Sequence, residues 1–502
     1  MGGLMPSFTP FSVHASYVRG VEAMAVEVQV SATGGLPGIK IVGLPGTSVL
    51  ESAARIRSAF KSCGFDVPRL NVYVNLVPGS IQKTGTGFDL PIAVAILAAT
   101  EQIPHDYLDG CLLVGELGLE GSVYGVRGEV AYEALAASQG LSLVTGRGGE
   151  GGGAADAYRI ESLAALRGGQ DALVRRSSKG GVADANADAG ASPLDFADVV
   201  DQEMAKRAIV IAVAGGHGFL MMGPPGAGKS MLAKRMPTIM PPLGDDERRE
   251  ALLIHSVSGL PTADIAAGVR PFRAPHHSIS NAGLVGGGRP VMPGEISLAH
   301  RGVLFLDELP EFGKHALQSL RQPMEDHEVR IVRVDGVYAF PADFLLVAAA
   351  NPCPCGHYGD PGHECRCTPA MIDGYLGKVG GPLMDRIDMQ VDVVRPRSRE
   401  VVRGSRGTDT ATMRDQVMAA IEYRRWRERR HGTACAREEL SHELEADAQE
   451  ALVSLASRLA MGGRAIVRSS RVARTIADLA EHEFVRVEDV IEACGYRTRS
   501  KT

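Results

Sequence analysis

Apolar and polar positions in the first part of the chain alternate between the spacing of strands and the spacing of helices. Val26–Val30, Lys40–Val42 and Asn71–Leu76 are short runs with the pattern of strands, whereas Ser48–Ser62 and Leu90–Thr100 place their apolar residues at helical intervals. Glycine-rich turns separate several of these runs. The pattern predicts a compact α/β domain, which we place at residues 1–145.

A second set of apolar runs predicts another α/β domain, at residues 194–400. Phe219–Met222, Val303–Leu306 and Phe344–Ala349 are apolar at every position. Strands of parallel sheets have this composition because helices cover both of their faces. Residues 401–502 form a predicted helical domain, whose expected helices are Thr410–Arg430, Ala446–Leu459, Ser469–His482 and Arg486–Cys494.

The composition changes between the two α/β domains. Gly148–Ala155 and Ser177–Ala191 are dense in Gly, Ala, Ser and Asp. Such composition is typical of flexible linkers. We therefore predict a linker at residues 146–193, with one short ordered piece at Tyr158–Leu166.

Composition and charge narrow the classes of function. The chain has 502 residues and a formal net charge of −6, so nucleic-acid contacts would have to come from local basic patches. No run approaches the roughly 18 uninterrupted apolar residues of a membrane span, and the first residues lack the pattern of a secretory signal. We therefore expect a cytoplasmic protein without membrane contact, whose eight cysteines are reduced.

The candidate phosphate site is Gly223-Pro-Pro-Gly-Ala-Gly-Lys-Ser230, which fits G-x-x-x-x-G-K-[ST] and follows an apolar strand. Lys229 would place a positive charge on the β- and γ-phosphates, and the Ser230 hydroxyl would ligate Mg²⁺. A glycine-rich turn with an exposed lysine is the alternative, but the strand before the loop and the helical pattern after it favour nucleotide binding. The glycines that let backbone N–H groups turn towards phosphates are Gly223, Gly226 and Gly228.

Two other strand ends carry polar residues suited to ATP hydrolysis. Asp307 can hold the hydration shell of Mg²⁺, and Glu308 can act as general base for the attacking water. Asn351 ends a third strand and can orient that water. Such acids also cap helices, and such an Asn also occupies turns. Their place downstream of a phosphate loop favours the catalytic interpretation.

Four cysteines form two C-x-C pairs, Cys353 with Cys355 and Cys365 with Cys367, separated by nine residues. Four thiolates in a reducing compartment suit tetrahedral Zn²⁺, and a histidine between the pairs could replace one of them. Four free thiols are the alternative. The clustering favours a structural zinc site after Asn351.

Two basic features are candidates for contact with nucleic acid. Val329–Phe340 has the pattern of a hairpin with Asp335-Gly336 at its turn, and Arg330 and Arg333 could meet phosphates there. Arg424–Arg430 is the densest basic run and includes the only tryptophan. A solvated hairpin and a solvated or inter-subunit helix face are the alternatives, and both stay open.

Longer motifs resemble one family. Leu383-Met-Asp-Arg-Ile-Asp388, Arg270-Pro-Phe-Arg-Ala-Pro-His-His-Ser278 and Asn351-Pro-Cys-Pro-Cys-Gly356 resemble the YifB/ComM family of magnesium-chelatase-like AAA+ ATPases. Stretches near both ends, Gly35–Pro45 and Val472–Leu479, are similar to the same family. The resemblance covers nearly the whole chain except the linker.

The resemblance implies roles that the local patterns do not assign. Arg386 matches the arginine finger that reaches the ATP of a neighbouring subunit. Arg464 matches the second sensor, with Arg468 and Arg471 as alternatives. Members of the family are expected to form hexamers. A homo-oligomeric ring follows from the resemblance.

The first domain resembles the S5-like fold of Lon-type proteases, in which a serine and a lysine cut peptide bonds. In this chain Gly87 stands at the serine position, and the lysine position falls near Val130. Because nucleophile and base are both missing, we expect no proteolysis by that route.

Three functions fit a P-loop ATPase of this kind. The first is a DNA motor that unwinds or branch-migrates single-stranded or branched DNA in recombination or natural transformation. The second is a magnesium-chelatase-type subunit that drives metal insertion, and the third is a chaperone-like remodelling ATPase. The resemblance favours the DNA motor.

Overall fold

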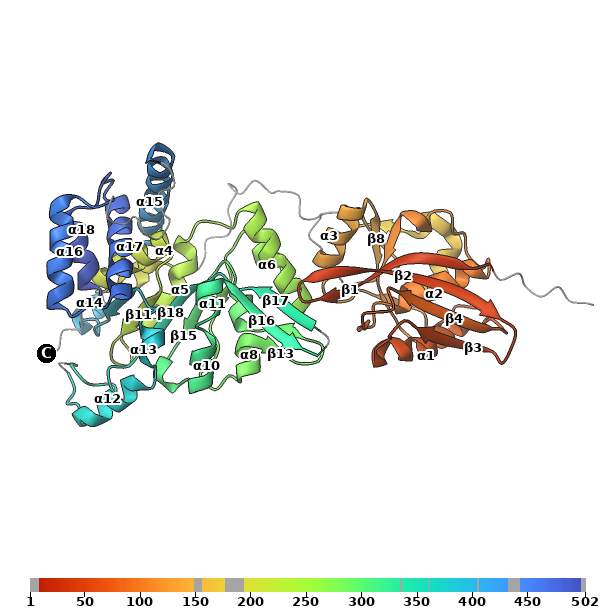
Figure 1. Cartoon of the computed structure of the whole chain (residues 1–502), viewed down its shortest axis with the longest axis horizontal. Coiled ribbons are helices and arrows are strands. Elements are labelled where there is room, and N and C mark those ends of the chain that lie inside the picture. The colour runs from red at the N-terminus through yellow and green to blue at the C-terminus, as the bar shows by residue number, and fades with distance from the viewer. Residues whose placement is uncertain are drawn as a thin grey trace, which may run out of the picture.

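The computed structural model describes residues 9–148, 156–176, 194–334, 336–360, 362–403, 406–431 and 443–497. Two α/β units lie side by side along the long axis, and the C-terminal helices pack at the far end of the second unit (Figure 1). This is the mixed α/β fold with a parallel sheet and a helical C-terminal part that the sequence predicts.

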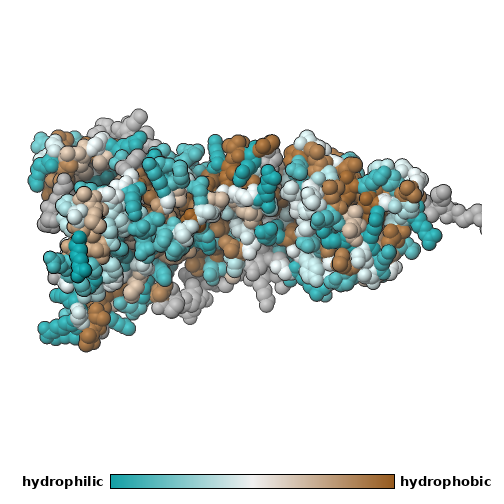
Figure 2. Space-filling view, turned by 90° about the horizontal axis from the view of Figure 1, so that it is seen from below, coloured by the Kyte–Doolittle hydropathy of each residue, from teal (hydrophilic) through white to brown (hydrophobic). Residues whose placement is uncertain are grey.

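Figure 2 shows hydrophilic and hydrophobic residues interspersed over one face of the molecule. None of the helices in the described ranges combines the length and the apolar character needed to cross a bilayer.

The N-terminal unit is built on an eight-stranded sheet with the order β10-β9-β8-β5-β1-β2-β4-β3. The predicted strands and helices of this unit are confirmed within β2, β3, β4, α1 and α2. After its first residue, Asp89, helix α2 is apolar on all sides, as expected of a helix whose residues are all buried, here against α1 and the sheet. The strands are β1 (Phe11–Arg19), β2 (Glu22–Thr33), β3 (Gly38–Val42), β4 (Asn71–Val77), β5 (Cys111–Leu113), β8 (Ser142–Thr145), β9 (Ala157–Arg159) and β10 (Val174–Arg175). A small ribbon of β6 (Glu116–Leu117) and β7 (Val123–Tyr124) accompanies the helices α1 (Thr47–Ser62), α2 (Asp89–Ala99) and α3 (Glu129–Gln139).

Residues 157–175 add β9, η2 and β10 to this unit, so the ordered piece predicted at Tyr158–Leu166 is longer than expected and the linker predicted at 146–193 is corrected there. Strand β9 pairs parallel to β8, and β10 pairs antiparallel to β9. Between them the short helix η2 (Leu163–Ala172) buries Leu163 and Leu166. The two strands have only three and two residues, too few to show a period in the sequence. Of the other linker residues, 149–155 and 177–193 lie outside the described residues.

The second unit holds a five-stranded sheet, β12-β15-β18-β11-β19, in which all neighbours are parallel. Phe219 and Met221 of β11 enter one buried cluster, and Leu220 and Met222 enter another on the opposite face. Both faces are therefore covered, as the continuous apolar runs predict. The strands are β11 (Phe219–Met222), β12 (Phe272–Arg273), β15 (Val303–Leu306), β18 (Leu345–Ala350) and β19 (Met389–Asp392).

Helices and two ribbons surround this sheet. The ribbons are β13 (Gly286–Gly287) with β14 (Met292–Pro293), and β16 (Glu328–Arg333) with β17 (Gly336–Pro341). The second ribbon confirms the predicted hairpin, although Asp335 lies outside the described residues. The helices are α4 (Glu203–Gly215), α5 (Lys229–Ile239), α6 (Asp245–Ser258), α7 (Ala263–Ala266), α8 (Asn281–Val285), α9 (Glu295–Leu298), α10 (Lys314–Ser319), α11 (Pro323–Asp326), α12 (Pro369–Gly377) and α13 (Gly381–Met384).

The C-terminal part consists of helices, as predicted. They are α14 (Ser398–Arg403), α15 (Thr410–His431), α16 (Ala446–Arg458), α17 (Gly463–Leu479) and α18 (Val487–Gly495). Helices α15 and α17 pack against α4 of the second unit. The buried Arg427 of α15 pairs with Asp478 of α17 at 3.0 Å and with Glu443 at 3.1 Å, which ties the helices together.

The two α/β units meet at α3 and α6. The backbone N–H of Val130 donates to Ser256 Oγ at 3.3 Å, and that of Gly128 donates to the Ser256 carbonyl at 3.0 Å. Val130 is buried with residues from and beside α6, namely Leu243, Ala251, Leu252 and Ile265. A second contact joins the β1–β2 turn to the β16–β17 hairpin, where the Arg19 guanidinium lies 5.4 Å from the centre of the Tyr338 ring.

We predict that Arg176 holds residues 157–175 on the N-terminal unit. Its guanidinium pairs with Glu129 and Glu133, which are both buried. Arg176→Ala leaves two buried carboxylates without this partner and should lower the free energy of unfolding of the unit by about 3 kcal/mol. Hydrogen exchange of the β8, β9 and β10 amides, followed by mass spectrometry on the full chain, measures the change.

Arg175→Ala is the matched control. Arg175 pairs with Asp156 at 2.6 Å, but both side chains are more than half exposed, so its loss should leave the protection of these amides close to that of the wild type. Equal protection in the two variants would contradict the structural role of Arg176.

Candidate nucleotide site

The carboxyl ends of three parallel strands bring the predicted nucleotide residues together. Strands β15 and β11 lie on either side of β18. Ser230 Oγ donates to Asp307 Oδ2 at 2.7 Å, and Lys229 Nζ donates to Asn351 Oδ1 at 3.1 Å. Residues that are far apart in the sequence therefore meet at one edge of the sheet. The hydroxyl and carboxylate oxygens are the hard donors that Mg²⁺ prefers.

The phosphate loop is shaped by its glycines. A β-carbon on Gly223 would lie 2.1 Å from the carbonyl oxygen of Val393, so only glycine fits there. Gly228 has φ 94°, which is unfavourable for other residues, and it leads directly into α5. The amino end of α5 therefore faces the loop, with its partial positive charge available to an anion.

Lys229 is held inside this loop. Its side chain is nearly buried, and Nζ donates to the carbonyls of Gly223 at 2.6 Å and Pro224 at 3.0 Å. Burial lowers the pKa of Lys229, and the nearby Asp307 and Glu308 oppose that shift. The ammonium group is positioned to meet an anion at the mouth of the loop.

Glu308 follows Asp307 in a left-handed backbone conformation, φ 52°. Its N–H donates to Asp307 Oδ1 at 2.9 Å, and its Oε2 lies 3.1 Å from Nδ1 of His277. The contact with Glu308 was missed because the two residues are distant in sequence and no periodic pattern connects them.

Arg386 lies at the opposite end of β11. Asp388, two residues further on, accepts a hydrogen bond from the Gly218 N–H at 2.9 Å, just before β11 begins. Between Gly218 and Gly223 about 16 Å of extended chain separates this point from the phosphate loop. The guanidinium of Arg386 pairs with Glu325 at 2.5 Å. Arg386 is therefore not placed to reach the phosphate loop of its own chain.

The candidate second sensors are distributed along α17. Arg468 Nη1 donates to the Arg386 carbonyl and to Asp388 Oδ1, both at 2.5 Å. Arg464 is exposed one turn before it. Arg468 therefore shares the end of the sheet that holds Arg386. No sequence signal shows this proximity, since it depends on how the helical part packs.

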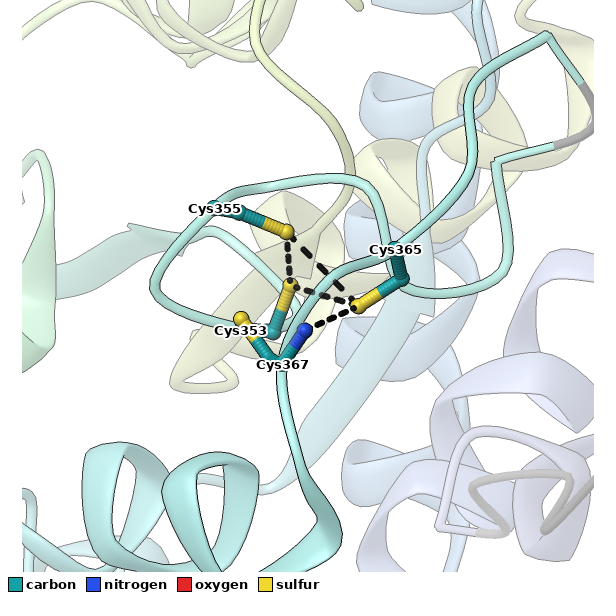
Figure 3. A group of neighbouring side chains, drawn as sticks. All are labelled: Cys353, Cys355, Cys365 and Cys367. Carbon is teal, nitrogen blue, oxygen red and sulfur yellow. Dashed lines mark hydrogen bonds between the residues drawn. The ribbon is translucent and has the colours of Figure 1, made fainter.

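The four cysteines converge in the loop after Asn351 (Figure 3). Their sulfurs all lie within 4.8 Å of one another, with Sγ–Sγ distances of 3.3 Å for Cys353–Cys355, 3.7 Å for Cys353–Cys365 and 3.6 Å for Cys355–Cys365. Four sulfurs about 2.3 Å from one tetrahedral ion would be about 3.8 Å apart. The cluster can therefore hold a metal ion with little movement.

Backbone N–H groups support the sulfurs as ligands. The N–H of Tyr358 points to Cys353 Sγ at 3.4 Å, and that of Cys367 points to Cys365 Sγ at 3.5 Å. Backbone donors from His357 and Arg366 lower the pKa of Cys355 to about 6, whereas burial and the neighbouring thiols raise the pKa of Cys365 to about 12, so Cys355 loses its proton more readily than Cys365.

A second polar trio beside the cysteines has a different geometry. His357 and His363 each place Nδ1 3.3 Å from Asp360 Oδ2, but their rings stack with only 22° between planes. Two imidazoles that share an ion must both point their planes at it, which stacked rings do not. Arg395 also lies 3.1 Å from Nδ1 of His363. The trio is better described as a polar network around the Arg395–Asp360 ion pair, which stabilises the loop.

The remaining candidates for chemistry lie away from this edge. Arg330 and Arg333 are exposed on the β16–β17 hairpin, and Arg330 pairs with Glu328. In the basic run of α15, Arg427 is buried in ion pairs and Arg424 donates to the Ala214 carbonyl at 3.1 Å, so part of the run stabilises the fold.

Gly87 and Val130, which the resemblance to Lon-type proteases aligns with the serine and the lysine, both lie in packed surroundings. A β-carbon on Gly87 would lie 3.0 Å from Val114, and Val130 is buried against α6. The buried Lys83 donates to the backbone carbonyls of Gly43 and Pro78. This region is occupied by structural contacts.

Comparison with known proteins covers nearly the whole chain. Three family models match consecutive parts: "Subunit ChlI of Mg-chelatase" at residues 26–145, "Magnesium chelatase, subunit ChlI" at 195–401 and "Magnesium chelatase, subunit ChlI C-terminal" at 407–497. A "Magnesium-chelatase 67 kDa subunit" of Chlorobaculum parvum is 28% identical over 31% of this chain and 23% of its own.

Two relatives match over almost their full length. "Uncharacterized protein YifB" of Escherichia coli is 38% identical over 97% of this chain and 96% of its own. "Competence protein ComM" of Haemophilus influenzae is 37% identical over 97% of this chain and 97% of its own. With the motifs and the parallel sheet, this identity shows that the chain belongs to the YifB/ComM family of magnesium-chelatase-like proteins.

Proposed function

We propose that the protein is a Mg²⁺-dependent AAA+ ATPase that works as a ring, expected to be a hexamer, and drives the unwinding or branch migration of DNA. One observation carries the proposal. Lys229, which suits phosphate, contacts Asn351, which suits water, and Ser230 contacts Asp307, with which it can ligate a metal ion. Arg386 lies at the other end of β11.

Each of these side chains would have a separate role in the hydrolysis of ATP. Lys229 neutralises charge on the β- and γ-phosphates, and Ser230 with Asp307 would hold Mg²⁺, which when bound offsets negative charge on the phosphates. Glu308 accepts a proton from water while the water oxygen bonds to the γ-phosphorus. The bond between that phosphorus and the bridging oxygen breaks, and ADP and phosphate leave. Asn351 orients the water.

The placement of Arg386 supports a ring. An arginine that stabilises the transition state is worth about 10³–10⁵ in rate, and Arg386 is too far from its own phosphate loop to act there. A neighbouring copy would supply it. To do so, Arg386 exchanges its pairing with Glu325 for the neighbour's γ-phosphate.

Two observations support DNA as the substrate. The β16–β17 hairpin presents the exposed Arg330 and Arg333, and the full-length relatives include a protein named for competence. The 67 kDa magnesium-chelatase subunit of Chlorobaculum parvum matches only about a third of this chain at 28% identity, which makes metal insertion the weaker alternative. A remodelling ATPase is favoured by a different feature: three exposed apolar side chains on the hairpin, Val332, Val334 and Val337.

We also propose that the cysteine cluster holds a structural Zn²⁺. The sulfur distances and the backbone donors support it. A β-carbon on Gly356 would lie 2.6 Å from Cδ of Pro225, so the cysteine loop packs directly on the phosphate loop. The metal would thereby help to fix the shape of the nucleotide site.

Glu308→Gln should abolish turnover while ATP still binds. The amide keeps the size of the side chain but cannot accept the proton, so the expected loss is about 10²–10⁴-fold. Steady-state phosphate release and binding of a fluorescent ATP analogue measure the two quantities. Glu311→Gln is the control, because its carboxylate pairs with Lys378 at 3.6 Å outside the site. Normal turnover in Glu308→Gln would overturn its role as base.

Single-stranded or branched DNA should stimulate ATP turnover and bind in a salt-sensitive way. The double variant Arg330→Ala/Arg333→Ala should keep its DNA-free turnover but bind DNA more weakly. Its log–log salt slope should fall by about 0.7 for each lost phosphate contact on single strands. DNA without effect on turnover or binding would contradict the motor proposal, and stimulation by an unfolded protein instead would favour remodelling.

The purified chain should contain about one zinc ion, as expected of a single four-thiolate site. Cys365→Ser should lose it and bind ATP more weakly because the loop against Pro225 loosens. Elemental analysis and nucleotide titration measure both effects. Cys494→Ser, a buried cysteine of α18 outside the cluster, should keep the metal. A zinc-free wild-type chain with full ATP affinity would contradict the proposal.

A further inference from the structure

We propose that the exposed side of the last two turns of α15, formed by Arg425, Trp426, Arg429 and Arg430, binds single-stranded DNA. We call this surface the Trp426 face. The proposal rests on the DNA substrate proposed above and adds a second contact surface to the β16–β17 hairpin. The two surfaces are separate, since α15 lies among the C-terminal helices, well away from the hairpin (Figure 1).

The basic run of α15 has a side that packs on the fold and a side that is exposed. Arg424 donates to the Ala214 carbonyl at 3.1 Å, and Arg427 pairs with Asp478 at 3.0 Å. The four residues of the Trp426 face are exposed and occur at helical spacing, so they share one side of α15. The contacts of the fold account for Arg424 and Arg427 and leave the Trp426 face to solvent.

The exposed indole is the feature that packing does not explain. Trp426 is the only tryptophan of the chain, and 39% of its surface is accessible. Cations in the last turn of a helix offset the helix dipole, so stability alone accounts for arginines there. It does not account for a large aromatic ring that stays in water, because burial of such a ring is favourable. A stacking ligand accounts for both.

Neighbouring side chains order the indole ring before any ligand binds. The Arg430 guanidinium lies 5.3 Å from the centre of the Trp426 ring, and the Tyr423 ring lies 5.2 Å away with 38° between planes. Arg430 also pairs with Glu483 at 3.5 Å. A side chain that is already ordered loses less conformational entropy on binding. A base that stacks on the ring takes the place of the Arg430 guanidinium, which then pairs with the adjoining phosphate.

Charge and shape favour a single strand of nucleic acid. Arg425 and Arg429 are one helical turn apart, whereas Glu422 lies one turn before Trp426 on the same side. The basic charge is therefore concentrated around the indole in the last two turns. Proteins that hold single strands combine arginines for the phosphates with aromatic rings for the bases. In a duplex the bases are stacked on one another, so their faces are closed to the indole.

Tryptophan fluorescence of the full chain tests the proposal at this face alone, because Trp426 is the only tryptophan. A thymidine homopolymer, which does not pair with itself, should quench the emission, and higher salt should weaken the quenching. A duplex of the same length and a polyphosphate without bases should leave the emission unchanged. Emission that the homopolymer does not change, or that polyphosphate quenches equally, would overturn base stacking on Trp426.

Substitutions of the arginines test the phosphate contacts by the same fluorescence titration. Arg425→Ala/Arg429→Ala should weaken the quenching and lower its log–log salt slope by about 0.7 for each lost phosphate contact. Arg414→Ala is the matched control, since Arg414 is an exposed arginine of the first turns of the same helix. Equal quenching curves for the double variant and the control would overturn the phosphate contacts.

Substitution of the indole tests stacking by anisotropy of a labelled homopolymer. The chain for this test carries Arg330→Ala/Arg333→Ala, which removes the hairpin arginines. In it Trp426→Ala should weaken binding about tenfold, within the range for one stacked base, and Trp426→Phe should restore most of the affinity. Unchanged affinity in Trp426→Ala, or a loss that Trp426→Phe does not restore, would contradict stacking.

Failure of the proposed function gives a different result from failure of this surface. Quenching by DNA that does not stimulate ATP turnover would confirm the Trp426 face and contradict the motor. Stimulated turnover without quenching would overturn the Trp426 face and leave the motor standing. Emission that changes with protein concentration in the absence of DNA would assign the face to contact between copies and overturn the proposal.

Discussion

The parallel alignment of β11, β18 and β15 is the constraint on which the candidate site depends. Parallel strands end at the same edge of the sheet. The strand order alone therefore places the phosphate loop, Asn351 and the pair Asp307 and Glu308 side by side. The Ser230–Asp307 hydrogen bond, 2.7 Å long, spans the central strand and links the two outer ones. A shift in the register of β18 would separate these groups.

The same alignment places Arg386 at the opposite edge of the sheet from the phosphate loop. Strand β19 is parallel to β11, so the residues just before β19 lie at the amino end of the sheet. A single chain therefore carries a phosphate loop at one end and Arg386 at the other. Stacking copies around a ring brings opposite ends together, which is how one fold can form complete sites only at its interfaces. The cysteine loop and the N-terminal unit contact the elements around the site, namely Pro225 and the β16–β17 hairpin.

The sequence predicts local structure well where a pattern is long or a motif is strict. The apolar runs of β11, β15 and β18 and the helices α15, α16 and α18 were predicted within one or two residues of their bounds, whereas α17 begins at Gly463, well before the predicted Ser469. The phosphate loop can be predicted from the spacing of its glycines, Lys229 and Ser230 alone. The two-residue strand β10 has no periodic signal, and the Ala- and Gly-rich composition around it favours a linker, so the extent of the N-terminal sheet was underestimated.

A single sequence does not predict which residues of distant segments come into contact. His277 meets Glu308, and Glu325 meets Arg386, because tertiary packing brings together segments that share no period or motif. The cysteine cluster was predictable because its four members lie close in sequence. The same reasoning could not place Arg468 beside Arg386, which depends on how α17 packs against the second unit.

Mixing two inactive variants tests most directly whether neighbouring copies share a site. Lys229→Ala chains lack a working phosphate loop but keep Arg386, and Arg386→Ala chains have the converse defect. In rings assembled at random from equal amounts, about one quarter of the sites would combine an intact loop with an intact Arg386. ATP turnover of the mixture should then rise well above either variant alone, towards about a quarter of the wild-type rate. A mixture that never exceeds the sum of its two components, at any ratio, would contradict a shared site.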